Sequence, residues 1–119
     1  MSQSNLLDAT EAQAIVLTEA TQLSASGIVS RTVLQSPEAR VALFTFAEGQ
    51  ELTSHTNRRR AFVQILTGEC EFFFADRWQR LGPGTFLNLP PNHPHAVKAT
   101  HGAFSMLLTL CAETATATS

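Results

Sequence analysis

The sequence is poor in charge, and this shortage excludes one large class of protein. Only 15% of the residues are charged, and eight basic residues against ten acidic ones give a net charge of −2. A nucleic-acid-binding protein needs a basic face that displaces counterions from phosphate, which this composition does not provide. We therefore expect no nucleic acid among the partners.

The sequence also lacks long apolar runs and paired cysteines. No segment approaches the roughly 18 apolar residues of a membrane helix, and the N-terminus does not resemble a signal peptide, so no membrane partner is expected. The two cysteines, Cys70 and Cys111, lie 41 positions apart inside apolar runs, without a CxxC pattern. Reduced, buried thiols are the simplest interpretation, and they favour a cytoplasmic location.

The length and the hydrophobic content predict one globular domain with two flanking segments. A length of 119 residues and a hydrophobic content of 44% suffice for a single core. Residues 1–27 form an N-terminal segment, with a short helix predicted where Thr10 caps the chain three residues before Gln13. This segment is expected to join the main domain or a dimer interface. The domain proper is predicted over residues 28–111, and residues 112–119 are predicted to be a flexible tail.

Residues 28–111 have the pattern of short strands separated by turns. The predicted strands are 28–35, 39–47, 51–57, 61–67, 69–75, 78–81, 85–89, 95–100 and 103–111. Turn residues about every eight to twelve positions are typical of a sandwich or barrel. Since no segment beyond residue 27 has the apolar period of a helix, the predicted fold class is all-β.

Two stretches that begin with glycine carry a family resemblance. The first, GQELTSHTNRRRAFVQILTG, runs from Gly49 to Gly68, and the second, GTFLNLPPNHPH, runs from Gly84 to His95. Together they resemble the two signature motifs of the cupin superfamily, whose members are small double-stranded β-helix (jelly-roll) barrels. The resemblance covers residues 28–111 and implies an RmlC-like cupin barrel with a degenerate first motif.

The degeneracy concerns the residues that hold a metal in a typical cupin. The family's first motif supplies His, His and Glu, and the corresponding residues here are His55, Asn57 and Ala61. The second motif supplies a histidine, which is His95. In that motif Asn92 replaces a glycine, at a turn where Asn tolerates positive φ best after Gly.

The resemblance implies a divalent transition metal (Fe, Mn, Ni, Cu or Zn), and the substitutions weaken that implication. Ala61 has no donor atom, and the neutral amide of Asn57 is a poor partner for such a metal. His55 and His95 remain as ligands, and the candidates for a third ligand are the carbonyl oxygen of Asn57 and His93. His93 is a candidate because residues two apart in an extended segment face the same way. The alternatives are a solvent-facing His93 and a hydrogen-bonded histidine pair in a pocket without metal.

Strand alternation predicts what lines the barrel. If Ala61 faces inward, its strand neighbours at 63 and 65 do so as well, and Gln64 faces outward. The predicted ligand pocket consists of inward-facing apolar side chains: Val63, Ile65, Val97 and Met106. A concave, mostly apolar cavity of this kind suits a small organic molecule.

Two further clusters concern partners. Arg58–Arg60 is either a solvated loop or an anion clamp at the pocket mouth, where arginine can grip a carboxylate bidentately. Phe72–Phe74 place aromatic rings on both faces of one strand. Small cupins commonly dimerise, so we expect a homodimer that buries the outward-facing ring.

Three functions remain open at this point. The favoured one is a small cupin of unassigned activity that binds a metal weakly through His55 and His95, and a small organic ligand in the barrel. The second is a metal-dependent dioxygenase or isomerase acting on a small molecule. The third is a metal-free sensor or binding module, because a fold alone does not determine function.

Overall fold

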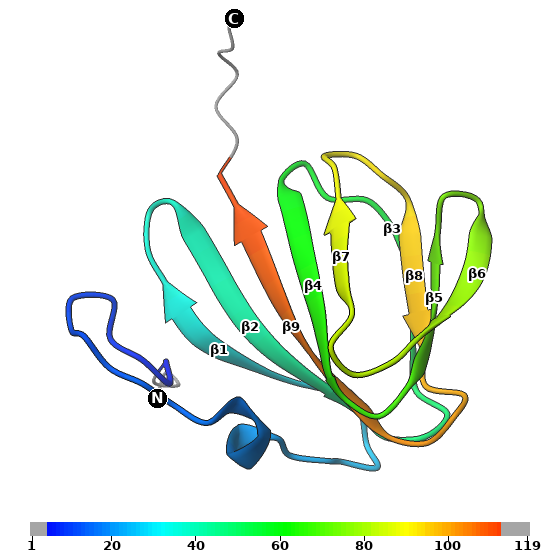
Figure 1. Cartoon of the computed structure of the whole chain (residues 1–119), viewed down its shortest axis with the longest axis horizontal. Coiled ribbons are helices and arrows are strands. Elements are labelled where there is room, and N and C mark those ends of the chain that lie inside the picture. The colour runs from blue at the N-terminus through cyan, green and yellow to red at the C-terminus, as the bar shows by residue number, and fades with distance from the viewer. Residues whose placement is uncertain (1–4, 113–119) are drawn as a thin grey trace, which may run out of the picture.

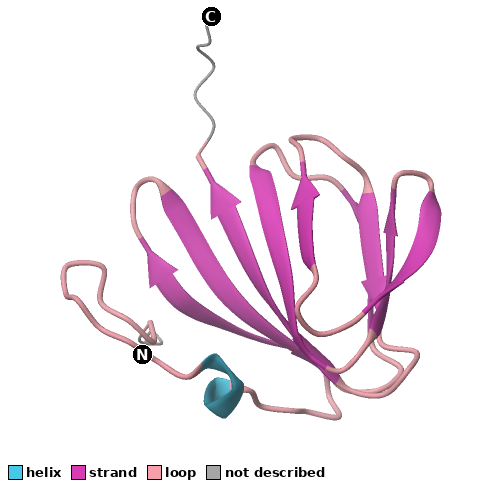
Figure 2. Ribbon diagram, viewed as in Figure 1, coloured by secondary structure: helices cyan, strands magenta, loops and turns pink. Residues whose placement is uncertain are grey.

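The computed structural model describes residues 5–112 and confirms the all-β prediction (Figures 1 and 2). Its elements are a single 3-10 turn, η1 (Leu17–Ala20), followed by β1 (Val29–Gln35), β2 (Ala39–Phe46), β3 (Glu51–His55), β4 (Arg60–Thr67), β5 (Cys70–Phe74), β6 (Arg77–Leu81), β7 (Phe86–Leu89), β8 (His95–Lys98) and β9 (Phe104–Cys111). In this part of the chain no helix is long and apolar enough to cross a membrane.

The strands form two antiparallel sheets. The larger sheet has the order β1-β2-β9-β4-β7, and the smaller has the order β3-β8-β5-β6. The chain crosses between the sheets several times, so segments that are distant in the sequence become neighbours. In the smaller sheet β3 pairs with β8, which brings His55 of the first motif opposite His95, the last residue of the second.

The core lies between the sheets and follows strand alternation. In β4, Ala61, Val63 and Ile65 are buried while Gln64 is exposed, as the alternation predicted. The buried cluster comprises Phe46, Ala61, Val63, Ile65, Cys70, Phe72, Leu87, Leu89, Val97, Ala99, Phe104 and Met106. Phe46 and Phe104 stack with ring centroids 4.5 Å apart, which joins β2 to β9 inside the barrel.

A second apolar cluster lies on the outer face of the larger sheet. It is centred on Ala20, Val33 and Leu43, against which side chains of the N-terminal segment pack. The amides of Leu6 and Leu7 donate to the carbonyls of Thr32 and Val33. Residues of the N-terminal segment therefore cover sheet surface that would otherwise be exposed and apolar.

The predicted helix capped by Thr10 is not formed. The amide and hydroxyl of Thr10 both donate to the Asp8 carboxylate, and Gln13 Oε1 accepts from the Asp8 amide. These local side-chain bonds compete with helix formation, and the helical turn occurs later, at Leu17–Ala20. Of the predicted tail, residues 113–119 lie outside the described residues.

At two motif positions the backbone conformation explains which residue occurs there. Gly68 has φ +73°, and a Cβ built there would lie 2.2 Å from the carbonyl oxygen of Ala103, so only glycine fits this turn. Asn92 has φ +64°, which confirms the prediction that it stands in for glycine. Asn92 shapes the turn before β8, which borders the site described next, whereas Gly68 lies at the opposite end of β4, beside the start of β9.

Candidate functional site

The site begins with two histidines that meet across paired strands. His55 ends β3 and His95 begins β8, and the two are directly opposite each other in the register. Their ring centroids are 4.1 Å apart, with planes inclined at 62°. Antiparallel pairing thus joins the first motif's histidine to the second motif's histidine, as the resemblance implied.

Both rings are oriented by backbone carbonyls. His55 Nδ1 lies 2.9 Å from the carbonyl oxygen of Thr53, and His95 Nδ1 lies 2.9 Å from that of His93. A carbonyl only accepts, so each Nδ1 carries the proton and each neutral ring keeps a lone pair on Nε2. This is the tautomer that metal-binding histidines have when a carbonyl fixes the other nitrogen.

The two rings differ in their surroundings. His95 is only 7% exposed, and its ring is stacked over Phe72 with centroids 6.3 Å apart, whereas His55 is exposed. Burial lowers the pKa of His95, and the neighbouring His55 and His93 lower it further, against an opposing effect of the hydrogen bond to the His93 backbone. His95 is therefore held neutral, which is the state that binds a metal.

Asn57 is engaged elsewhere. Its Oδ1 accepts a hydrogen bond of 3.0 Å from the Arg59 amide, and its carbonyl accepts one of 2.7 Å from the Asn92 amide. The side chain closes an Asx turn, and the carbonyl ties the β3–β4 loop to the turn before β8. The oxygen predicted as a metal ligand is thus already a hydrogen-bond acceptor.

His93 is also engaged, in a role that the sequence did not indicate. Its Nε2 accepts a hydrogen bond of 3.2 Å from the amide of Ala75. Ala75 and Asp76 have φ of +52° and +65°, the two positive values of a tight hairpin turn between β5 and β6. His93 therefore connects the turn before β8 to this hairpin through the nitrogen that a metal would need.

The donor set near the histidine pair is small. The position of the family's glutamate is occupied by Ala61, which is buried in the core. Among residues 5–112, no group of three or more His, Cys, Asp or Glu side chains is placed to hold a metal ion. The residues present fit a two-histidine site completed by water or ligand, and they do not fit a centre with three protein ligands.

The predicted pocket residues pack together inside the barrel. Val63, Ile65, Val97 and Met106 are each 3% exposed or less and belong to one core cluster. They line none of the surface cavities described below. Their role as a ligand pocket remains a prediction.

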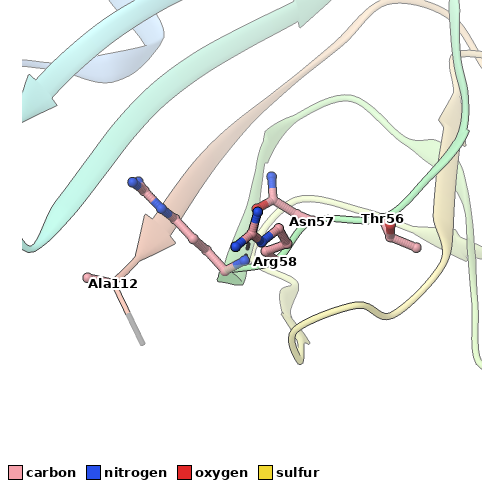
Figure 3. A pocket seen from close by; sticks show the side chains of 5 residues that line it. Thr56, Asn57, Arg58 and Ala112 are labelled. Carbon is pink, nitrogen blue, oxygen red and sulfur yellow. Dashed lines mark hydrogen bonds between the residues drawn. The ribbon is translucent and has the colours of Figure 1, made fainter. Parts of the chain in front are cut away.

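A polar cavity lies beside the loop that follows His55 (Figure 3). It has a volume of about 820 Å³ and is lined by Thr56, Asn57, Arg58, Arg59 and Ala112. The loop residues follow β3 directly, and Ala112 follows the end of β9. Arg58 and Arg59 are exposed here, so the arginine cluster lines a hollow at this end of the molecule.

A second cavity was not predicted from the sequence. It has a volume of about 390 Å³, lies on the outer face of the smaller sheet, and is lined by Glu51, Leu52, Thr53, Ser54, Phe73, Trp78 and Ala96. The Lys98 ammonium lies 4.2 Å from the centroid of the Trp78 ring. The sequence signal for this cavity was Phe73. Because Phe72 and Phe74 both face the core, strand alternation places the Phe73 ring on the outer face.

Comparisons with known proteins agree with this architecture. A family model described as a cupin domain matches residues 42–111. A conserved protein of unknown function from Streptococcus pyogenes is 28% identical with a TM-score of 0.78, over 97% of this chain and 100% of that one. An RmlC-like cupin from Desulfovibrio desulfuricans is also 28% identical, with a TM-score of 0.76, over 85% of this chain and 97% of that one.

A third known structure is similar to this chain in fold only. It is a cupin superfamily protein from Desulfitobacterium hafniense, 24% identical with a TM-score of 0.79, over 92% of this chain and 100% of that one. No curated protein matches this chain.

Proposed function

Because this chain belongs to the cupin family, we propose that it is a small-molecule-binding cupin that holds a divalent transition metal weakly through His55 and His95. The observation that carries this proposal is the placement of the two opposed rings, whose Nδ1 atoms both lie on backbone carbonyls. In a neutral ring this leaves Nε2 as the nitrogen available to a metal. Imidazole nitrogen suits Zn, Cu, Fe and Ni. No donor other than these two nitrogens is needed for weak binding.

Weak binding follows from the missing donors. A structural or catalytic site of high affinity uses three or four protein ligands, and this site supplies two. The Asn57 oxygen and the His93 Nε2 already accept hydrogen bonds from backbone amides. Recruiting either one would leave a backbone donor without its partner, at a cost of about 1–3 kcal/mol if that donor is buried.

The small number of protein ligands favours a ligand-binding role over a dedicated enzyme. A two-histidine site leaves several coordination positions open, so an organic ligand with oxygen donors would complete the metal's shell. A dioxygenase or isomerase function is supported less, because no third protein ligand joins the two histidines among residues 5–112. Cytoplasmic location and a homodimeric state, expected from the cysteines and from Phe73, form part of the same proposal.

Calorimetric titration of the metal-free protein with Zn²⁺, Ni²⁺ and Mn²⁺ tests the proposal. We expect one weak site whose affinity is greater for Zn²⁺ and Ni²⁺ than for Mn²⁺, in line with imidazole ligands. The His55→Ala/His95→Ala variant should lose this site. His101→Ala is the matched control, because His101 pairs with Glu71 at the surface and makes no contact with the histidine pair. Equal binding by the double variant would contradict the metal site and leave a metal-free binding module.

A further inference from the structure

We propose that Arg58 and Arg59 form a binding site for the carboxylate of a small organic anion. This inference rests on the proposed function, because it names the chemical class of the ligand that this end of the barrel would take. The arginines line the cavity of about 820 Å³ that begins one residue beyond His55 (Figure 3). Among residues 5–112, no acidic side chain belongs to the lining of that cavity.

The loop that carries the two arginines is held in place. The Arg59 amide donates to Asn57 Oδ1, and the Asn57 carbonyl accepts from the Asn92 amide. These two bonds anchor the loop to itself and to the turn that precedes His95. An anchored loop loses less conformational freedom when a ligand binds than a free one does.

The two guanidinium groups are without a counterion in the part of the chain that the structure describes. Within residues 5–112, neither Arg58 nor Arg59 is within ion-pair distance of a carboxylate, whereas the Arg80 guanidinium is paired with Glu69. The neighbouring Arg60 differs, because its guanidinium donates to Asn88 Oδ1 on β7. Two cations that pair with no carboxylate of residues 5–112 therefore face the same cavity.

Strand register places further positive charge at this end. Arg40 pairs with Leu110 across β2 and β9, and Ala61 pairs with the same Leu110 across β4 and β9. Arg40, Arg58, Arg59 and Arg60, half of the eight basic residues in the sequence, thus lie toward the end of the barrel where β4 begins and β9 ends. Glu38 lies at the same end, where its carbonyl accepts from the Ala112 amide, and the Arg40 guanidinium donates to Thr32 Oγ1 on β1. The four arginines outnumber this carboxylate. The summed field of such a cluster attracts anions from solution.

The chemistry favours a carboxylate. Guanidinium groups present paired N–H donors in a planar fork that matches the two oxygens of a carboxylate. Because both arginines are exposed, salt will screen the interaction, and binding will weaken as ionic strength rises. The expected ligand is a small organic acid of modest affinity.

Titration of the metal-free protein with succinate, followed by nuclear magnetic resonance of the backbone amides at low ionic strength, tests the inference. We expect saturable shifts confined to residues 56–59 and their neighbours. In the Arg58→Gln/Arg59→Gln variant the dissociation constant should rise about tenfold or more, as expected when charge-assisted hydrogen bonds are lost. The Arg77→Gln/Arg80→Gln variant removes the same net charge from the β5–β6 hairpin and should bind succinate as the wild type does.

Three outcomes would overturn the inference: no saturable shift, equal binding by the Arg58→Gln/Arg59→Gln variant, or equal weakening in both double variants, which would indicate net charge alone. Inorganic phosphate serves as the competing anion, and tighter binding of phosphate than of succinate would also contradict a carboxylate site. The His55→Ala/His95→Ala variant separates this inference from the proposed metal site. Succinate binding that survives in this variant supports the arginine site even where metal binding fails.

Discussion

At the scale of single residues, His95 carries the clearest electrostatic consequence of the fold. Its burial lowers its pKa below the ordinary value of 6.5. Between the lowered pKa and about 6.5 the unfolded chain binds a proton at this position that the folded chain does not, so acid favours unfolding. The contribution of His95 to stability is complete above about pH 6.5 and is lost as the pH falls through the folded-state value.

We therefore predict that the free energy of unfolding decreases as the pH falls below about 6.5. Urea denaturation at a series of pH values measures this dependence. The His95→Gln variant, which cannot titrate at this position, should show a smaller decrease over the same range. An unchanged slope in that variant would show that other groups cause the acid sensitivity.

Gly68 supports a second prediction at the residue scale. A Cβ at this position would lie 2.2 Å from the Ala103 carbonyl oxygen, and the backbone has φ +73°. We expect Gly68→Ala to lower the free energy of unfolding by about 1–3 kcal/mol, through steric overlap and backbone strain. Gly27→Ala is the control, since no atom lies within 4 Å of its Cβ position. Similar effects of the two substitutions in thermal unfolding would argue against a special role of Gly68.

At the scale of elements, β5 shows how alternation divides one strand between two environments. Phe72 is 1% exposed and packs in the core, whereas Phe73 faces outward and contacts Trp78, with ring centroids 5.5 Å apart. The sequence could predict this division because the side-chain period of a strand is two.

The two phenylalanines make a matched pair of substitutions. Phe72→Ala should lower the free energy of unfolding by about 3–5 kcal/mol, because it removes a buried ring from a packed core. Phe73→Ala should cost clearly less, because its ring is partly exposed. Chemical denaturation of both variants measures the difference, and a larger cost for Phe73 would contradict the orientation of β5.

The elements also show where prediction from sequence succeeded and where it failed. The nine predicted strands correspond to the nine observed in residues 5–112, because alternation and turn residues are local signals. The prediction of a helix capped by Thr10 was wrong, because the amide and hydroxyl of Thr10 both donate to the Asp8 carboxylate instead. The engagement of His93 by Ala75 could not be foreseen, because that bond joins residues 18 positions apart through the three-dimensional fold.

At the scale of the whole molecule, exposed aromatic rings mark two faces. Trp78, 44% exposed, lies with Phe73 on the outer face of the smaller sheet, and Phe86, 59% exposed, packs near Phe62 on the larger one. The homodimer proposed from Phe72–Phe74 would use the first of these faces.

We predict that the wild-type protein is a dimer and that Trp78→Glu is a monomer, because the substitution places a charge in the proposed interface. Sedimentation velocity at several protein concentrations measures the change, and Phe86→Glu on the opposite sheet should leave the dimer intact. If Phe86→Glu were monomeric and Trp78→Glu dimeric, the interface would lie on the larger sheet, contrary to the proposal.

Elemental analysis shows whether the two opposed histidines, His55 and His95, bind a metal. Untagged protein is dialysed against Zn²⁺, freed of unbound metal by brief gel filtration, and analysed beside the His55→Ala/His95→Ala variant. We expect zinc bound to the wild-type protein to approach one equivalent as the zinc concentration of the dialysis rises, and we expect the variant to lose it. Equal zinc in both proteins at every concentration would contradict a metal site at His55 and His95.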